Sequence, residues 1–187
     1  MFNENIMLKD LKNNEFLFLD RDGVINERII GGYILDYKDF HFKDGVLEAL
    51  KIFNKHFKKI FIVTNQQCIG KGLLEEKDFI KLSNQMLEDI KLNGGRIDKV
   101  YYCPNLKTDN SPLRKPGVGM GLQAQKDYPE VDFSKSVMVG DSNSDMVFGK
   151  RLEMTTVFVD NRTGEEYDEG LIDWKCSSLI EFANSLK

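Results

Sequence analysis

The chain has 187 residues, of which 41% are hydrophobic and 30% charged, and its formal net charge is −4. This length fits a single domain over residues 1–187 with enough apolar residues to bury a core, which argues against a disordered chain. The slight acidic excess argues against nucleic acid or an anionic membrane as the main partner. Three widely spaced cysteines, none in a CxxC pair, disfavour a disulfide framework and a cysteine-based zinc site.

Neither a leader nor a membrane span is expected from the sequence. The chain opens Met1-Phe2-Asn3-Glu4, without the basic region and apolar run of a signal peptide. No apolar run approaches the ~20 residues that a membrane helix needs. We therefore expect a cytoplasmic protein, and a monomer.

Short apolar runs alternate with amphipathic stretches along the chain. The apolar runs predict buried strands over residues 16–19, 60–63, 99–102, 136–139 and 156–159. Helical spacing predicts helices around residues 46–53, 79–90 and 144–152. A capping box from Ser178 to Glu181 predicts the start of a C-terminal helix. Strands that alternate with helices imply right-handed βαβ units, and hence an α/β fold with a doubly wound, mainly parallel sheet.

Carboxylates gather directly after the predicted strands. In parallel sheets the carboxyl ends of the strands share one edge, and ligands bind beyond it. Four aspartates are expected there: Asp20, Asp22, Asp141 and Asp145. Their charges would repel one another unless a cation lay among them, and oxygen ligands without His or Cys suit Mg²⁺. The sequence therefore predicts a magnesium site at this edge.

Two basic and two neutral polar residues are expected at the same edge. Arg114 and Lys115 follow a longer loop, and Thr64 and Asn65 end a strand. An anionic substrate would account for cations beside a metal site, and Thr64 and Asn65 add donors for phosphate oxygens. Each group alone is also typical of an ordinary turn, helix cap or solvated loop. Their joint placement at strand ends favours a site that binds phosphate.

Four segments together resemble the motifs of the haloacid dehalogenase superfamily of aspartate-nucleophile phosphatases. They are residues 18–26 (FLDRDGVIN), 63–66 (VTNQ), 114–116 (RKP) and 140–146 (GDSNSDM). Within the superfamily they are similar to the D-glycero-D-manno-heptose 1,7-bisphosphate phosphatases and the related histidinol-phosphate phosphatases. The resemblance runs from about residue 16 to 159. It implies a Rossmann-like fold, and the segments between the motifs leave no room for a large cap domain.

The resemblance implies a role for each matching residue. Asp20 would attack phosphorus and form an aspartyl-phosphate, and Asp22 would protonate the leaving alcohol and then activate water. Asp20, Asp141 and the main-chain carbonyl of Asp22 would hold Mg²⁺. Thr64 and Lys115 would bind the transferring phosphoryl group. The rest of the substrate would contact four further side chains: Asn26, Asn65, Gln66 and Arg114.

General chemistry agrees with these roles. A carboxylate can attack a dianionic phosphate only if its charge is offset, which Mg²⁺ and Lys115 would do. An acid that later acts as a base needs a raised pKa, and we expect this of Asp22. Alternate residues of an extended segment share a face, so Asp20 and Asp22 should point to the same side.

Two positions depart from the family pattern. The family's zinc loop generally carries a Cys-x-His pair and a second cysteine pair, whereas here Asn105 follows Cys103 at the histidine position and residues 108–113 contain no cysteine. We therefore expect no structural zinc. Ser142 also stands where heptose bisphosphatases often carry a lysine after the metal-binding aspartate. That difference bears on the substrate more than on the chemistry.

The leading hypothesis is removal of the 7-phosphate from D-glycero-D-manno-heptose 1,7-bisphosphate, a small phosphorylated substrate. A histidinol-phosphate phosphatase is an alternative with the same chemistry. A silent binding module on this fold is another, against which intact Asp20 and Asp22 argue. A mutase is disfavoured because no cap would exclude water. Within residues 22–45, Gly31-Gly32-Tyr33 is expected to form a flap with an aromatic tip.

Overall fold

The computed structural model describes residues 11–161 and 166–187. Residues 1–4, on which the expectation of no leader rests, lie outside these ranges. No helix in the described ranges is long and apolar enough to cross a membrane.

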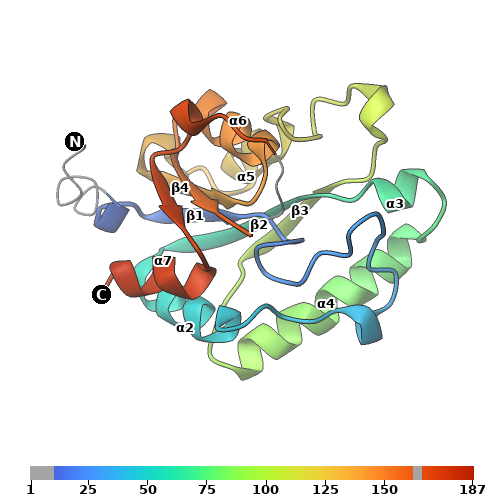
Figure 1. Cartoon of the computed structure of the whole chain (residues 1–187), viewed down its shortest axis with the longest axis horizontal. Coiled ribbons are helices and arrows are strands. Elements are labelled where there is room, and N and C mark those ends of the chain that lie inside the picture. The colour runs from blue at the N-terminus through green and yellow to red at the C-terminus, as the bar shows by residue number, and fades with distance from the viewer. Residues whose placement is uncertain (1–10, 162–165) are drawn as a thin grey trace.

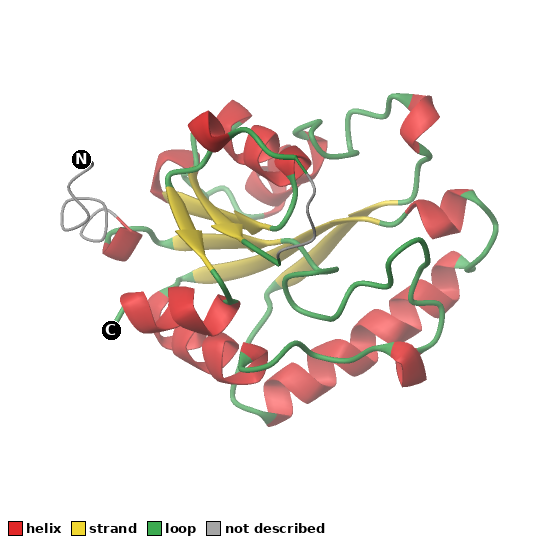
Figure 2. Ribbon diagram, in the orientation of Figure 1, coloured by secondary structure: helices red, strands yellow, loops and turns green. Residues whose placement is uncertain are grey.

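A six-stranded parallel sheet forms the centre of the fold (Figures 1 and 2). Its strands are β1 (Phe16–Leu19), β2 (Lys59–Asn65), β3 (Lys99–Cys103), β4 (Ser136–Gly140), β5 (Thr155–Val159) and β6 (Trp174–Cys176). They lie in the order β3-β2-β1-β4-β5-β6, so β1 is central and the chain winds outward from it in both directions. Leu19 pairs with Ile62 of β2 and Val139 of β4, which brings these three strands to one level at their carboxyl ends. The predicted doubly wound α/β fold is confirmed.

Helices cover both faces of the sheet (Figure 1). One face is covered by α2 (Val46–His56), α4 (Glu76–Leu92) and α7 (Leu179–Ser185), and the other by α5 (Gly119–Asp127) and α6 (Asn143–Arg151). The short helix α3 (Gln67–Gly70) follows β2, and 3₁₀ turns lie at η1 (Tyr37–Asp39), η2 (Lys107–Asp109), η3 (Phe133–Lys135) and η4 (Glu169–Leu171).

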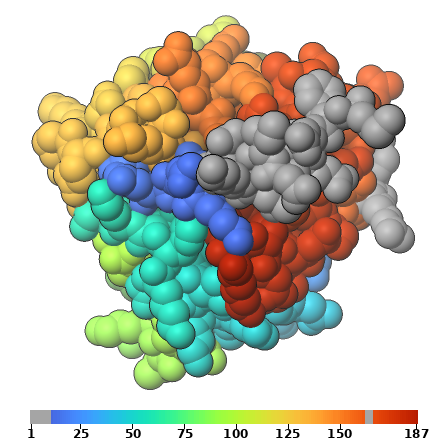
Figure 3. All heavy atoms as spheres, turned by 90° about the vertical axis from the view of Figure 1, so that its left-hand side faces the viewer, coloured from blue at the N-terminus to red at the C-terminus, as the bar shows by residue number. Residues whose placement is uncertain are grey.

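Alternation along the strands divides the core into two layers. Leu17 and Leu19 of β1 pack with the apolar residues of α2, α4 and α7, whereas Phe16 and Phe18 pack with those of α5 and α6. Such continuous apolar strands are typical of a sheet covered on both faces. Figure 3 shows α7, in red, beside α2, in cyan, and their Phe182 and Phe53 rings lie 5.3 Å apart between centroids.

The sequence analysis missed three elements, α3, α5 and β6. Helix α5 has a weak apolar stripe interrupted by glycines, and one of them, Gly121, packs so closely on Leu152 that a Cβ atom there would lie 2.4 Å from its Cδ1. Strand β6 has only three residues, too few to show a period. The predicted capping box of α7 is half present. Ser178 accepts a hydrogen bond from the Glu181 N–H, but the Glu181 carboxylate bonds to Ser177.

Candidate active site

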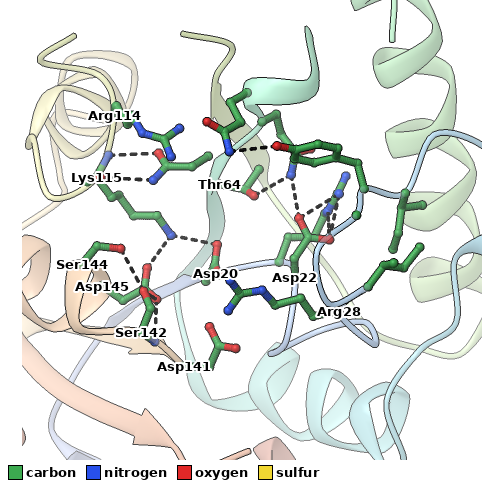
Figure 4. A pocket seen from close by; sticks show the side chains of 18 of the residues that line it. Asp20, Asp22, Arg28, Thr64, Arg114, Lys115, Asp141, Ser142, Ser144 and Asp145 are labelled. Carbon is green, nitrogen blue, oxygen red and sulfur yellow. Dashed lines mark hydrogen bonds and ion pairs between the residues drawn. The ribbon is translucent and has the colours of Figure 1, made fainter. Parts of the chain in front are cut away.

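A cleft of about 450 Å³ lies at the carboxyl end of the sheet (Figure 4). It is bounded by the ends of β1, β2 and β4, the loop before α5, and the segment 28–34 that follows β1. All predicted site residues except Asn26 line it: Asp20, Asp22, Thr64, Asn65, Gln66, Arg114, Lys115 and Asp141. The residues that the strand-end rule selected therefore do lie together in one cleft.

Lys115 joins two buried carboxylates at the floor of the cleft. Its Nζ atom lies 2.8 Å from Oδ1 of Asp20 and 2.5 Å from Oδ1 of Asp145, and all three side chains are almost wholly buried. Burial raises the pKa of Asp20 to about 6, although the Lys115 charge acts to lower it. Burial would likewise lower the pKa of Lys115, but the charges of Asp145 and Asp20 raise it, so this lysine remains protonated.

Asn65 holds the main chain of Lys115 in place. Its Oδ1 atom accepts from the Lys115 N–H at 3.0 Å, and its Nδ2 group donates to the Lys115 carbonyl at 3.1 Å. The end of β2 thereby fixes the loop that carries the lysine. This positioning contact was not expected from the sequence, whereas a direct contact of Asn65 with substrate stays a prediction.

Three buried carboxylates form a group that could hold a metal ion. Asp20, Asp141 and Asp145 each offer an oxygen, and these oxygens lie within 4.8 Å of one another. Burial, together with the charges of Asp20 and Asp145, raises the pKa of Asp141 to about 8. A divalent cation would relieve this repulsion, and an all-oxygen donor set suits Mg²⁺. The carboxylate of Asp22 is outside the group, so any contact of Asp22 with the metal must come from its main chain.

Gly23 allows the loop after β1 to approach Asp141, one of the candidate metal ligands. Its φ angle is +95°, and a Cβ atom there would lie only 2.0 Å from Oδ2 of Asp141. Asn161 completes this corner, since its Nδ2 group donates to the Gly23 carbonyl at 2.8 Å and to Asp141 at 3.0 Å. A side chain at position 23 would therefore displace Asp141.

Asp22 is held by donors from three residues. Arg21 Nη2 lies 2.9 Å from each Asp22 oxygen, Asn26 Nδ2 lies 3.0 Å from Oδ1, and Gln66 Nε2 lies 2.8 Å from Oδ2. Burial alone would raise the pKa of Asp22, but the Arg21 charge and these hydrogen bonds together hold it below its usual range. The expected raised pKa of Asp22 is therefore wrong for the substrate-free site.

The buried side chains of Asn26 and Arg21 donate to the Asp22 carboxylate and hold it in position. Asn26 is fully buried, does not line the cleft and donates to Asp22, whereas its predicted contact with substrate stays a prediction. Arg21 is 1% exposed, and its guanidinium lies over the Phe79 ring. Sequence reasoning treated Arg21 only as a spacer between the two aspartates. Its place between two aspartates, directly after a buried strand, was the available signal.

The predicted phosphoryl-binding hydroxyl and the flap both face the cleft. Thr64 Oγ1 accepts from Gln66 Nε2 at 2.9 Å. On the flap, the Tyr33 hydroxyl accepts from Gln67 Nε2 at 2.9 Å and Lys71 Nζ at 2.8 Å, which docks the flap on α3. Arg28 also lines the cleft, and its charge opposes the rise in the pKa of Asp141 (Figure 4). The sequence analysis missed Arg28.

Comparison with known proteins identifies phosphatases that are similar to this chain over most of its length. A family model described as HAD-hydrolase-like matches residues 112–177. The D-glycero-alpha-D-manno-heptose-1,7-bisphosphate 7-phosphatase of Campylobacter jejuni is 38% identical over 171 residues, which cover 91% of this chain and 95% of that protein. The D-glycero-beta-D-manno-heptose-1,7-bisphosphate 7-phosphatase of Haemophilus influenzae is 32% identical over 182 residues, covering 93% and 97%.

Solved structures share the fold. The D,D-heptose 1,7-bisphosphate phosphatase of B. bronchiseptica, complexed with magnesium and phosphate, has a TM-score of 0.82 at 24% identity and covers 92% of this chain and 97% of its own. A HAD-like phosphatase from Mesorhizobium loti has a TM-score of 0.76 at 28% identity, covering 93% and 86%. The extent and identity of the first matches settle the family. The chain is a phosphatase of the HAD-like superfamily and belongs to the D-glycero-D-manno-heptose-1,7-bisphosphate 7-phosphatase family.

Proposed function

We propose that this protein is a Mg²⁺-dependent phosphatase that removes the 7-phosphate from D-glycero-D-manno-heptose 1,7-bisphosphate. The observation that carries the proposal is the buried triad of Lys115, Asp20 and Asp145 beside Asp141, which pairs a nucleophilic carboxylate with a fixed cation. The substrate comes from the relatives, whose names specify this sugar. Those names include both anomers, so both need to be assayed.

In the first step an oxygen of Asp20 attacks phosphorus, and the bond from phosphorus to the sugar oxygen breaks. Lys115 keeps Asp20 ionised and offsets the charge of the transferring group, to which the Thr64 hydroxyl adds a donor. Mg²⁺ held by Asp20, Asp141 and Asp145 would neutralise further negative charge on the phosphoryl oxygens. The leaving alkoxide takes its proton from Asp22.

In the second step water attacks the phosphorus of the aspartyl-phosphate and gives its proton to Asp22. The bond between phosphorus and Asp20 breaks, which releases inorganic phosphate and restores the Asp20 carboxylate and the protonated Asp22. Splitting hydrolysis in this way replaces one difficult step by two easier ones. For Asp22 to act first as an acid, its pKa must rise when substrate binds, and the negative charge of a phosphate beside it acts in that direction.

The cleft is complete within one chain, which supports a monomer as the working form. Light scattering at the assay concentration tests this part of the proposal. The substrate is tested by kcat/KM on heptose 1,7-bisphosphate, in each anomer, against histidinol phosphate. We expect a preference of well over tenfold for the better heptose anomer. A preference below tenfold would overturn the substrate assignment and leave the phosphatase chemistry standing.

A further inference from the structure

A second hollow of about 600 Å³ adjoins the catalytic cleft. The two share Asn65, Arg114, Lys115 and Ser144 in their walls, so the hollow continues the cleft past Lys115. Its far wall comes from η2 and α6, which place Lys107 and Arg151 there. We call this hollow, lined by Lys107, Arg114 and Arg151, the basic groove.

The basic groove has an excess of positive charge. In the described part of the chain no Asp or Glu lines it, and none of Lys107, Arg114 and Arg151 forms an ion pair there. Lys150, next to Arg151 in the chain, instead pairs with Asp173 at 2.5 Å. Asp109 of η2 does not line the groove, and its carboxylate accepts from the Leu106 N–H at 2.9 Å.

Two of the three cations are anchored to the loop that carries the catalytic lysine. Arg151 Nη1 donates to the Pro116 carbonyl at 3.0 Å, and Arg114 Nη1 donates to the Asn105 carbonyl at 3.3 Å. Arginine donors that are already oriented lose less side-chain freedom when they bind an anion. The groove also offers neutral polar side chains, those of Asn110, Asn143 and Ser144.

These features suit an anion that stays bound while another group reacts at Asp20. The opposite wall of the cleft is the flap, where apolar residues and glycines surround the single cation Arg28, which lies near Asp141. We propose that the basic groove binds the second, non-transferred phosphate of a sugar bisphosphate. This inference rests on the proposed function and adds Lys107 and Arg151 as residues that determine specificity for a second phosphate.

The test compares two substrates that differ only in the second phosphate. kcat/KM is measured on heptose 1,7-bisphosphate and on heptose 7-phosphate, for the wild type, Lys107→Ala, Arg151→Ala and the double variant. We expect the double variant to lower the ratio of the two kcat/KM values by about tenfold, through KM for the bisphosphate, because several weak, exposed charge contacts are lost together.

Matched variants separate this effect from net charge and from folding. Lys126→Ala removes one exposed charge from α5, outside the groove, and should leave the ratio unchanged. Arg151→Lys keeps the charge and should keep most of the ratio, even if the hydrogen bond to Pro116 is weakened. An unchanged ratio in the double variant, or an equal loss on both substrates, would overturn the inference. A wild type that does not hydrolyse the bisphosphate would instead refute the proposed function, and this inference with it.

Discussion

The ammonium of Lys115 lies 2.8 Å from a carboxylate oxygen of Asp20, and both side chains are almost wholly buried. Burial acts to protonate this carboxylate, and Lys115 acts to keep it ionised. The second partner of Lys115, Asp145, is fixed by its own bond from the Ser142 N–H at 3.1 Å. Asp20, the proposed nucleophile, is therefore held by a cation whose position is set from both β2 and α6.

Asp20→Asn should abolish turnover while the fold is retained. An amide cannot attack phosphorus, yet its oxygen can still accept a hydrogen bond from Lys115, and repulsion with Asp141 falls. The measurement is kcat on the bisphosphate, with circular dichroism and a thermal melt of the same sample. Activity above a few per cent of wild type, in protein free of wild-type contamination, would show that Asp20 is not the nucleophile.

Asp22→Asn should also be severe, but the loss should depend on the leaving group. A sugar alkoxide needs a proton, whereas p-nitrophenolate leaves without one. We therefore expect a much smaller loss of kcat on p-nitrophenyl phosphate than on the sugar substrate. Equal losses on both substrates would mean that Asp22 positions the substrate and does not transfer protons. Asn26→Ala serves as the comparison, because Asn26 contacts Asp22 but not the cleft.

Lys115→Ala and Arg114→Ala should affect different kinetic constants. Lys115 faces the nucleophile, so its loss should lower kcat on the order of 10²-fold or more, as removal of one transition-state donor does. Arg114 lines the cleft wall beside Lys115, so the loss of Arg114 should act mainly on KM. Lys115→Ala also leaves two buried carboxylates without their cation, which costs roughly 3–5 kcal/mol of stability. Its melting temperature must therefore be measured first. The reverse kinetic pattern would show that the two roles are exchanged.

The sequence predicted the sheet, and the edge at which the candidate site residues gather, because both follow from strong local signals. Continuous apolar runs marked β1, β2 and β4, and parallel strands bring the residues after their ends to one edge. The contacts among those residues could not be predicted from the sequence. Nothing local shows that Arg21 turns back to its neighbour Asp22, or that Asn65 bonds to a loop fifty residues further on.

Long-range packing also determines the contacts and the pKa that the sequence did not predict. Asn26 matches a family motif, but the bridge pairings of Asn26 with Asp22 and Phe42 bury it behind the cleft. The pKa of Asp22 depends on the sum of burial and three donors, and no spacing rule gives the sign of such a sum. Asp145 became a partner of Lys115 through the first turn of α6, which brings it level with the end of β1.

The metal-free protein should lose stability as the pH rises. The pKa of Asp20 is raised to about 6 and that of Asp141 to about 8, from the ordinary value of 3.8, both chiefly by burial. Between about pH 4 and pH 8 the folded state therefore binds more protons than the unfolded state, so the free energy of unfolding falls as the pH rises through this window. Urea titrations in EDTA at pH 5, 6.5 and 8 measure this fall.

Mg²⁺ should reduce that fall, because the cation replaces the protons between the carboxylates. Burial lowers the pKa of His56, which acts in the opposite direction near pH 6. Asp141→Asn separates the two contributions, since it removes the carboxylate and leaves His56 unchanged. A pH dependence in EDTA that is identical for wild type and Asp141→Asn would contradict the assignment of the effect to this site.

The last prediction concerns zinc, where this sequence departs from the family pattern. A structural zinc site needs four good ligands, usually thiolate and imidazole. Between Tyr102 and Lys115 the only such side chain is Cys103, and both histidines lie on other segments. The Cys103 thiol is buried and donates to Oδ1 of Asn105 at 3.6 Å, so the position that the family gives to a ligand histidine holds an acceptor for the thiol.

We expect the purified protein to carry no stoichiometric zinc, and Cys103→Ser to retain both fold and activity. The loop 105–113 is rich in Asn, Thr, Ser and Pro, so turn chemistry can close it without a metal. EDTA should abolish turnover, and Mg²⁺ alone should restore it. Elemental analysis of protein purified without chelator measures the zinc directly. A content near one zinc per chain, lost in Cys103→Ser, would mean that residues outside this loop, or a second chain, complete a zinc site.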